Sequence, residues 1–146
     1  MQSSISVHCK KDNLKSIRAF LGSKLQEASI SDSDINLIVL AVDEICANII
    51  IHSNKCDESK VMDLEIQCIL ESSTLKINLL DEGEFFDFSL YQESTLQSLV
   101  EQEKKGGLGL KLVRKIMDQI EFSKLGERNL CTMIKKVQMN YFTPSF

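Results

Sequence analysis

Strand-like segments of this chain come in closely spaced pairs, and this pairing restricts the possible folds more than any other feature. Residues 61–70 and 74–80 alternate loosely between apolar and polar side chains on either side of a turn at 71–73. Residues 120–125 and 130–137 form a second pair around a turn at 126–129. Strands joined by such short turns run antiparallel. The sequence therefore predicts antiparallel hairpins rather than a parallel, doubly wound sheet.

Apolar residues at helical spacing predict three helices outside these hairpins. The first covers about residues 11–28, the second runs from an N-cap-rich stretch at 31–34 to about Ser53, and the third opens at Gly107. Residues 3–9 add an edge strand. This order predicts an α+β fold, in which helices pack on one face of a mixed, mostly antiparallel sheet to give a two-layer α/β sandwich.

Length and composition exclude several classes of protein. The 146 residues suit one domain, which we assign to residues 1–137, followed by a C-terminal tail at 138–146. A net charge of −4 argues against direct nucleic-acid binding, and no apolar run approaches the ~20 residues that span a membrane. Five cysteines without a C-x-x-C pair argue against a zinc site. Their odd number and the absence of a secretory leader predict a cytoplasmic protein with reduced thiols.

A first candidate motif lies on the second predicted helix. Glu44 and Asn48 are four residues apart, so their side chains stack on one face. The carboxylate can orient a hydroxyl or accept its proton, and the amide oxygen is a hard ligand of the kind that Mg²⁺ prefers. Taken alone, the pair is equally consistent with a solvated helix face.

A second candidate motif follows the first hairpin, where Asp81 stands two residues before Gly83. An acid at a strand end followed by glycine leaves room for a flat ligand beside the backbone. The carboxylate can accept a hydrogen bond from an exocyclic amine such as adenine N6. Asp and Gly are also common turn formers, so an ordinary turn remains open.

A third candidate motif is a glycine-rich run that leads into the last predicted helix. Such backbone at a helix N-terminus offers unpaired N–H groups to a phosphate, and two lysines add positive charge. The spacing fits neither the P-loop nor the Rossmann pattern, and a flexible loop with a helix cap remains an alternative. The run consists of Lys104, Lys105, Gly106, Gly107, Leu108 and Gly109.

In this order the three motifs resemble the ATPase domain family shared by histidine kinases, Hsp90, gyrase B and MutL, over about residues 31–137. Within that GHKL-type family, the whole chain looks most like the bacterial anti-sigma-factor serine/threonine protein kinases. The features that favour this subgroup are the compact length, the Glu-x-x-x-Asn-x-x-x-His pattern ending at His52, the Phe86-Asp87 pair and the Gly-Gly-Leu-Gly-Leu run. The resemblance implies a Bergerat-type ATP-binding fold.

The resemblance also implies a role for each motif. Asn48 would hold Mg²⁺, and Glu44 would position or deprotonate the attacking serine hydroxyl. Asp81 and Gly83 would bind the adenine, with Thr132 near the same ring. The loop at residues 88–105 would form a lid over ATP.

The glycine-rich run would bind the phosphates of ATP. Better-known kinases of the subgroup carry an arginine in this stretch, near the γ-phosphate, where this chain has Lys104 and Lys105. Lysine lacks the bidentate guanidinium group of arginine. We therefore expect this difference to affect the rate of phosphoryl transfer more than the binding of ATP. We expect Lys105 to serve in the arginine's place.

The resemblance predicts an ATP- and Mg²⁺-dependent kinase that phosphorylates a small anti-sigma antagonist protein and acts on transcription through a sigma factor. Relatives are often homodimers, which allows the same for this chain. An alternative is a non-catalytic switch that binds ATP and sequesters a partner protein. A third interpretation is a small interaction protein that has lost nucleotide binding.

Overall fold

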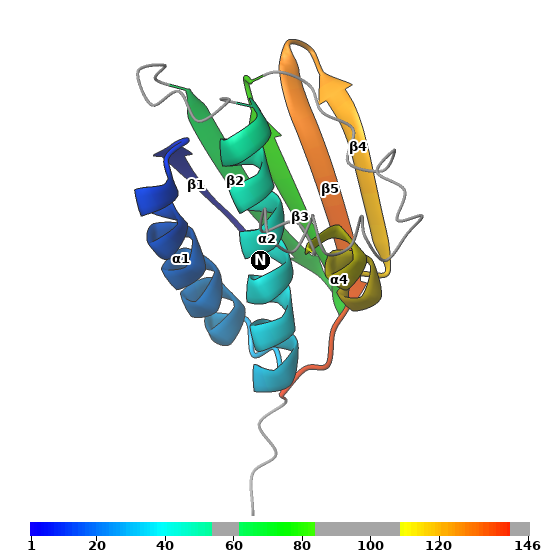
Figure 1. The fold of residues 1–146 in the computed structure, drawn as a ribbon. Coiled ribbons are helices and arrows are strands. Elements are labelled where there is room, and N and C mark those ends of the chain that lie inside the picture. Colours follow the sequence, from blue (N-terminus) through cyan, green and yellow to red (C-terminus); the bar gives the residue numbers. More distant parts are fainter. Residues whose placement is uncertain (54–61, 84–108, 141–146) are drawn as a thin grey trace, which may run out of the picture.

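The computed structural model describes residues 1–53, 62–83 and 109–140. Its five strands form one sheet in the order β1-β2-β3-β5-β4, and every neighbouring pair of these described strands is antiparallel (Figure 1). The predicted hairpins and the α+β class are confirmed, whereas the described strands contain no parallel pair that would make the sheet mixed. The strands are β1 Gln2–His8, β2 Asp63–Glu71, β3 Thr74–Asp81, β4 Gln119–Leu125 and β5 Arg128–Lys136.

Three α-helices of the described residues cover one face of this sheet (Figure 1). They are α1 Leu14–Glu27, α2 Asp32–Ser53 and α4 Gly109–Ile116, and a short 3-10 turn at Lys11–Asn13 precedes α1. Among the described helices, none combines the length and the hydropathy that crossing a bilayer requires. The predicted lid at 88–105 lies outside the described residues.

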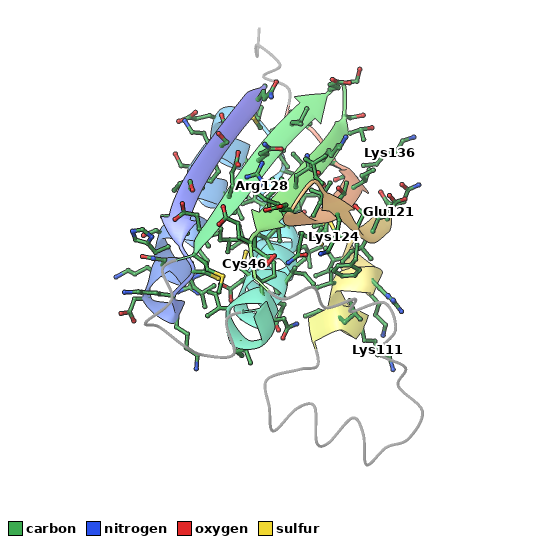
Figure 2. The ribbon with its side chains drawn as sticks, turned by 90° about the horizontal axis from the view of Figure 1, so that it is seen from above. Cys46, Lys111, Glu121, Lys124, Arg128 and Lys136 are labelled. Atoms are coloured by element: carbon green, nitrogen blue, oxygen red, sulfur yellow. The ribbon has the colours of Figure 1, made fainter. Side chains whose placement is uncertain are left out.

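The core lies between the helices and the sheet because the strands bury alternate residues. β2 buries alternate residues from Leu64 to Cys68 and β3 from Leu75 to Leu79, and α2 adds a broad apolar stripe that faces the sheet. Figure 2 shows these two layers from above, with Cys46 of α2 between them. The buried residues of this interface include Leu64, Ile66, Leu75, Ile77, Leu79, Ile38, Val42 and Ile45.

Local contacts fix both ends of the helical layer. At the start of α2 the hydroxyl of Ser31 accepts a hydrogen bond from the backbone N–H of Asp34 at 3.4 Å, as an N-cap residue does. Farther along, Arg18 of α1 donates to the carboxylate of Asp43 at 2.8 Å. At the other end of the layer, the ammonium of Lys135 donates to the carbonyl of Ile116 at 2.9 Å and caps α4. The bond between Arg18 and Asp43 therefore holds α2 against α1, and the bond from Lys135 ties α4 to β5.

The first residues of the predicted tail are bound to the start of α2. The backbone N–H of Ser31 donates to the carbonyl of Gln138 at 2.8 Å, and the N–H of Asn140 donates to the carbonyl of Ser29 at 2.6 Å. The N–H of Gln138 also donates to the Asp34 carboxylate at 2.7 Å. Residues 138–140 are thus held by the body of the fold, and residues 141–146 lie outside the described part.

The face of the sheet away from the helices is polar and internally hydrogen-bonded. The guanidinium of Arg128 donates to the carboxylate of Glu65 at 2.8 Å, and this contact lowers the pKa of that carboxyl below its usual value. On the same face, Asn78 donates to Gln67 at 3.2 Å and accepts from the hydroxyl of Thr132 at 2.9 Å. These bonds cross three strands and leave the other, apolar face to the helices.

Candidate functional site

Glu44 and Asn48 lie one turn apart in the second half of α2, as predicted. Asn48 is only 8% exposed, which is unusual for an amide on a helix. Glu44 is partly buried, and burial raises the pKa of its carboxyl, with a smaller contribution from the neighbouring charge of Asp43. A raised pKa brings a carboxylate closer to the range in which it can accept a proton during a reaction.

The backbone of Gly109, the first residue of α4, lies directly against the side chain of Glu44. A Cβ atom added at Gly109 would stand 2.9 Å from the Cβ and 3.0 Å from the Cδ of Glu44, and closer still to Oε2. These separations are shorter than real carbon contacts, so only glycine fits here without a rearrangement. The contact joins the helix motif to the glycine-rich motif, which are far apart in the sequence.

Asp81 ends β3 on the face that the helices cover, and it is only 3% exposed. The register places it opposite Asn129 at the start of β5. The amide Nδ2 of Asn129 donates to Asp81 Oδ1 at 3.0 Å, to Asp81 Oδ2 at 3.2 Å and to the carbonyl of Gly83 at 2.9 Å. One side chain therefore fixes both members of the predicted Asp-x-Gly motif.

Two buried thiols, Cys131 on β5 and Cys46 on α2, belong to the core between the sheet and the helices. Burial raises the pKa of Cys131 on β5, and the charge of Asp81 adds to this shift. Burial also raises the pKa of Cys46 on α2, with a further contribution from Cys131. All four cysteines in the described part of the chain are free thiols.

Thr132 is the predicted site residue that the structure does not bring to this place. Its hydroxyl lies on the outer face of the sheet, where it donates to Asn78. Side chains alternate along a strand, so Cys131 and Asn129 share the face of Asp81 and Thr132 does not. The expectation that Thr132 lies near the purine does not agree with this geometry. The remaining predicted residues, Lys104 to Leu108, lie outside the described residues.

Glu44 and Asn48 offer the oxygen ligands that a hard divalent cation accepts. Within the described residues, no group of three or more His, Cys, Asp or Glu side chains could hold a metal on its own. Mg²⁺ is commonly bound through one or two protein oxygens together with substrate phosphates and waters. An amide and a carboxylate on successive turns of α2 fit that mode of binding, with Asn48 as the predicted ligand.

Residues 7–135 match the family described as the histidine kinase-like ATPase domain. The chain belongs to this family. The match covers α2, both hairpins and α4, and so contains every motif on which the resemblance rests. Members of this GHKL ATPase family typically bind ATP with Mg²⁺.

Relatives within the family are serine-protein kinases named RsbW. That of Bacillus subtilis is 31% identical over 108 residues, covering 71% of this chain and 66% of the relative. That of Bacillus pumilus is 27% identical over 121 residues, covering 80% of this chain and 75% of the relative. This chain is thus a distant relative of the serine-protein kinases named RsbW.

Two solved structures share the fold. The RsbU and RsbW domains of a Mycobacterium tuberculosis protein match with a TM-score of 0.67 at 14% identity, over 98% of this chain and 35% of the other. The Acinetobacter baumannii histidine kinase AdeS matches with a TM-score of 0.52 at 16% identity, over 94% and 68%. At these identities the structures establish the common architecture alone.

Asn129 is the residue of this site that the sequence did not single out. It stands in the stretch 126–129, which reads as a hairpin turn, and Asn is a common turn residue. The signal that could have revealed it is the pairing of β3 with β5, which places Asn129 opposite Asp81.

Proposed function

We propose that this chain binds ATP with Mg²⁺ and transfers the γ-phosphoryl group to a serine or threonine of a small antagonist protein. In this role it would be an anti-sigma-factor kinase that acts on transcription through a sigma factor. The observation that carries the proposal is the packing of Gly109 on Glu44, because it joins a partly buried acid to the N-terminus of the helix that follows the glycine-rich run. The RsbW relatives support the choice of a serine or threonine acceptor.

Each described residue has a chemical task in this reaction. The carboxylate of Asp81 accepts a hydrogen bond from the exocyclic amine of adenine. Glu44 accepts the proton of the acceptor hydroxyl. The hydroxyl oxygen of the serine or threonine bonds to the γ-phosphorus while the bond between that phosphorus and the ADP oxygen breaks. Asn48 would be a ligand of Mg²⁺, which would supply positive charge to neutralise the phosphates. Phosphoryl transfer depends mainly on such positioning and charge neutralisation.

By the family resemblance, Lys104 and Lys105 stand where better-known kinases of the subgroup carry an arginine, and this departure favours a second candidate function. A lysine is a point charge that cannot donate a bidentate pair of hydrogen bonds to a phosphoryl group as arginine can. A chain that binds ATP but transfers slowly could serve as a switch that sequesters a partner protein. The two candidates share the nucleotide site and differ only in the transfer step.

A two-part experiment on the full chain separates the candidates. The melting temperature is first measured with ATP and Mg²⁺. A ligand at 100 times its dissociation constant adds about 2.7 kcal/mol, or about 5–10 °C for a protein of this size. Transfer from radiolabelled ATP to candidate antagonist proteins is then followed for the wild type and Glu44→Gln.

If the chain is a kinase, ATP with Mg²⁺ raises the melting temperature of both the wild type and Glu44→Gln, and only the wild type labels the antagonist. If the chain is a non-catalytic switch, ATP with Mg²⁺ raises the melting temperature of both proteins, and neither labels the antagonist. If the wild type shows no shift with ATP, nucleotide binding itself is wrong. Full transfer by Glu44→Gln would remove Glu44 from the mechanism and leave the binding site standing.

A further inference from the structure

The side-chain amide of Asn129 is hydrogen-bonded on one side only. Its nitrogen Nδ2 donates to neighbouring oxygens, whereas its oxygen Oδ1 has no hydrogen-bond partner among the described residues. Its Nδ2 faces three oxygen atoms, two from Asp81 and one from Gly83, at 2.9–3.2 Å. Its Oδ1 is buried, and within the described part of the chain it has no hydrogen-bond partner. Burying an acceptor without a partner costs about 1–3 kcal/mol, so such atoms are rare and call for an explanation.

The orientation of this amide follows from chemistry. All three neighbouring oxygens are acceptors, because a carboxylate and a carbonyl have no proton to donate at neutral pH. The reversed amide would place Oδ1 against these oxygens and would lose all three bonds. The unpartnered atom is therefore the acceptor. It lies beside the Asp81 carboxylate, because Oδ1 and Nδ2 share one carbon.

Two acceptors thus lie side by side at the end of the β3–β5 ladder. A carboxylate oxygen has room for more than one hydrogen bond, so Asp81 can still accept from a ligand while Nδ2 holds it. A single primary amine on an aromatic ring carries two protons in one plane. It can therefore donate one proton to each of the two acceptors at once.

We propose that Asn129 determines specificity for a purine with an exocyclic amine, because it fixes the Asp81 carboxylate through Nδ2 and presents Oδ1 as a second acceptor for that amine. The inference rests on the proposed nucleotide site and adds a residue to it. Asn129 is thereby a positioning residue for Asp81 as well as a contact of the base. The unpartnered oxygen gains its partner when the nucleotide binds.

The test compares two nucleotides that differ only in this amine, ATP and purine riboside 5′-triphosphate. Dissociation constants for both, with Mg²⁺, are measured by calorimetry on the wild type and on Asn129→Ala. We expect the wild type to bind ATP at least tenfold more tightly, because one hydrogen bond to a charged group is worth a factor of this order. In Asn129→Ala this ratio should fall several-fold through weaker ATP binding, while affinity for the purine riboside triphosphate stays the same.

The matched control is Asn78→Ala. Asn78 is also an amide in the sheet, part-buried and in two side-chain hydrogen bonds, but it lies on the outer face. It should leave the ratio between the two nucleotides unchanged. If Asn129→Ala does not fold, Asn129→Ser keeps a small polar group in the hairpin and takes its place with the same expectation.

The outcomes separate this inference from the function on which it rests. If wild type binds neither triphosphate, the proposed nucleotide site is wrong and the inference falls with it. If wild type prefers ATP and Asn129→Ala keeps that preference, or weakens both nucleotides equally, Asn129 does not read the amine. In that case the nucleotide site stands and Asp81 alone reads the base.

Discussion

Replacement of Gly109 by alanine tests whether the contact between α4 and Glu44 is as close as the structure indicates. The added Cβ would come within 2.9 Å of Glu44 Cβ and 3.0 Å of Cδ. The Oε2 atom at the end of the side chain can move away, but Cβ is fixed to α2, so α4 must shift as well. Overpacking of this kind costs about 1–3 kcal/mol.

A smaller effect of the opposite sign accompanies this cost. Gly109 does not have a left-handed backbone, so alanine is compatible with its conformation. In a helix, alanine is favoured over glycine by up to about 1 kcal/mol, and by less in the first turn. The net expectation is a loss of about 1–2 kcal/mol, or about 3–6 °C in melting temperature for a chain of this length.

Gly22→Ala is a matched control within the same protein. Gly22 lies inside α1, and nothing stands within 4 Å of the position that its Cβ would take. Alanine there should raise the stability by about 0.5–1 kcal/mol, because only the helix preference acts. The same substitution is thus expected to have opposite signs at the two glycines.

The decisive measurement is a double-mutant cycle with Glu44→Ala, followed by thermal or denaturant unfolding. Truncation of Glu44 removes Cδ and Oε2 and leaves Cβ, so only the part of the clash that involves Cδ and Oε2 disappears. The cost of Gly109→Ala should then fall by about 1 kcal/mol in the Glu44→Ala background. The reasoning is refuted if Gly109→Ala stabilises the chain as Gly22→Ala does, or if its cost is the same with and without Glu44.

Two further predictions concern the same part of the fold. Because burial raises the pKa of Glu44 above 4.5, its protonated form is favoured in the folded state, and its contribution to stability is lost as the pH rises through that raised pKa. Glu44→Gln should therefore gain stability relative to wild type as the pH rises from about 4 towards neutral, and a pH series of melting temperatures in which the difference stays constant would contradict this. Lys135→Met removes the ammonium that caps Ile116 and should cost about 1 kcal/mol. Lys136→Met should cost much less, because Lys136 donates to the Asp118 carboxylate through its backbone N–H, which the substitution keeps. Equal melting temperatures of the two variants would exclude the cap.

The two hairpins were predictable from the sequence because their signals are local. Alternating residues and a turn at 71–73 predict the first hairpin, and the structure pairs β2 with β3 around that turn. The apolar stripe of the second helix likewise predicts that α2 lies against the sheet. In each case a few neighbouring residues carry the whole signal, so no knowledge of distant contacts is needed.

The details of the base site were not predictable in the same way, because they depend on the register of strands that are distant in the sequence. A shift of one residue moves a strand side chain to the other face. Thr132 was expected near the purine, whereas the pairing of β3 with β5 turns it outward and turns Asn129 and Cys131 inward. The sequence predicts Gly109 as a phosphate-binding glycine, but its contact with Glu44 depends on how α4 docks on α2, which no local pattern specifies.

Three residues of this site bury polar groups in ways that cost free energy on folding. Glu44 is partly removed from water, Asp81 is 3% exposed, and Asn129 buries an acceptor that has no partner among the described residues. Each of these features costs free energy in the folded chain, and the apolar interface between helices and sheet must offset it. A ligand that brings an amine to Asp81 and Asn129 supplies the missing partners, so part of that cost is regained only in the complex. The preference for an amine-bearing purine should therefore weaken when Asn129 is removed, whatever the change in the stability of the free protein.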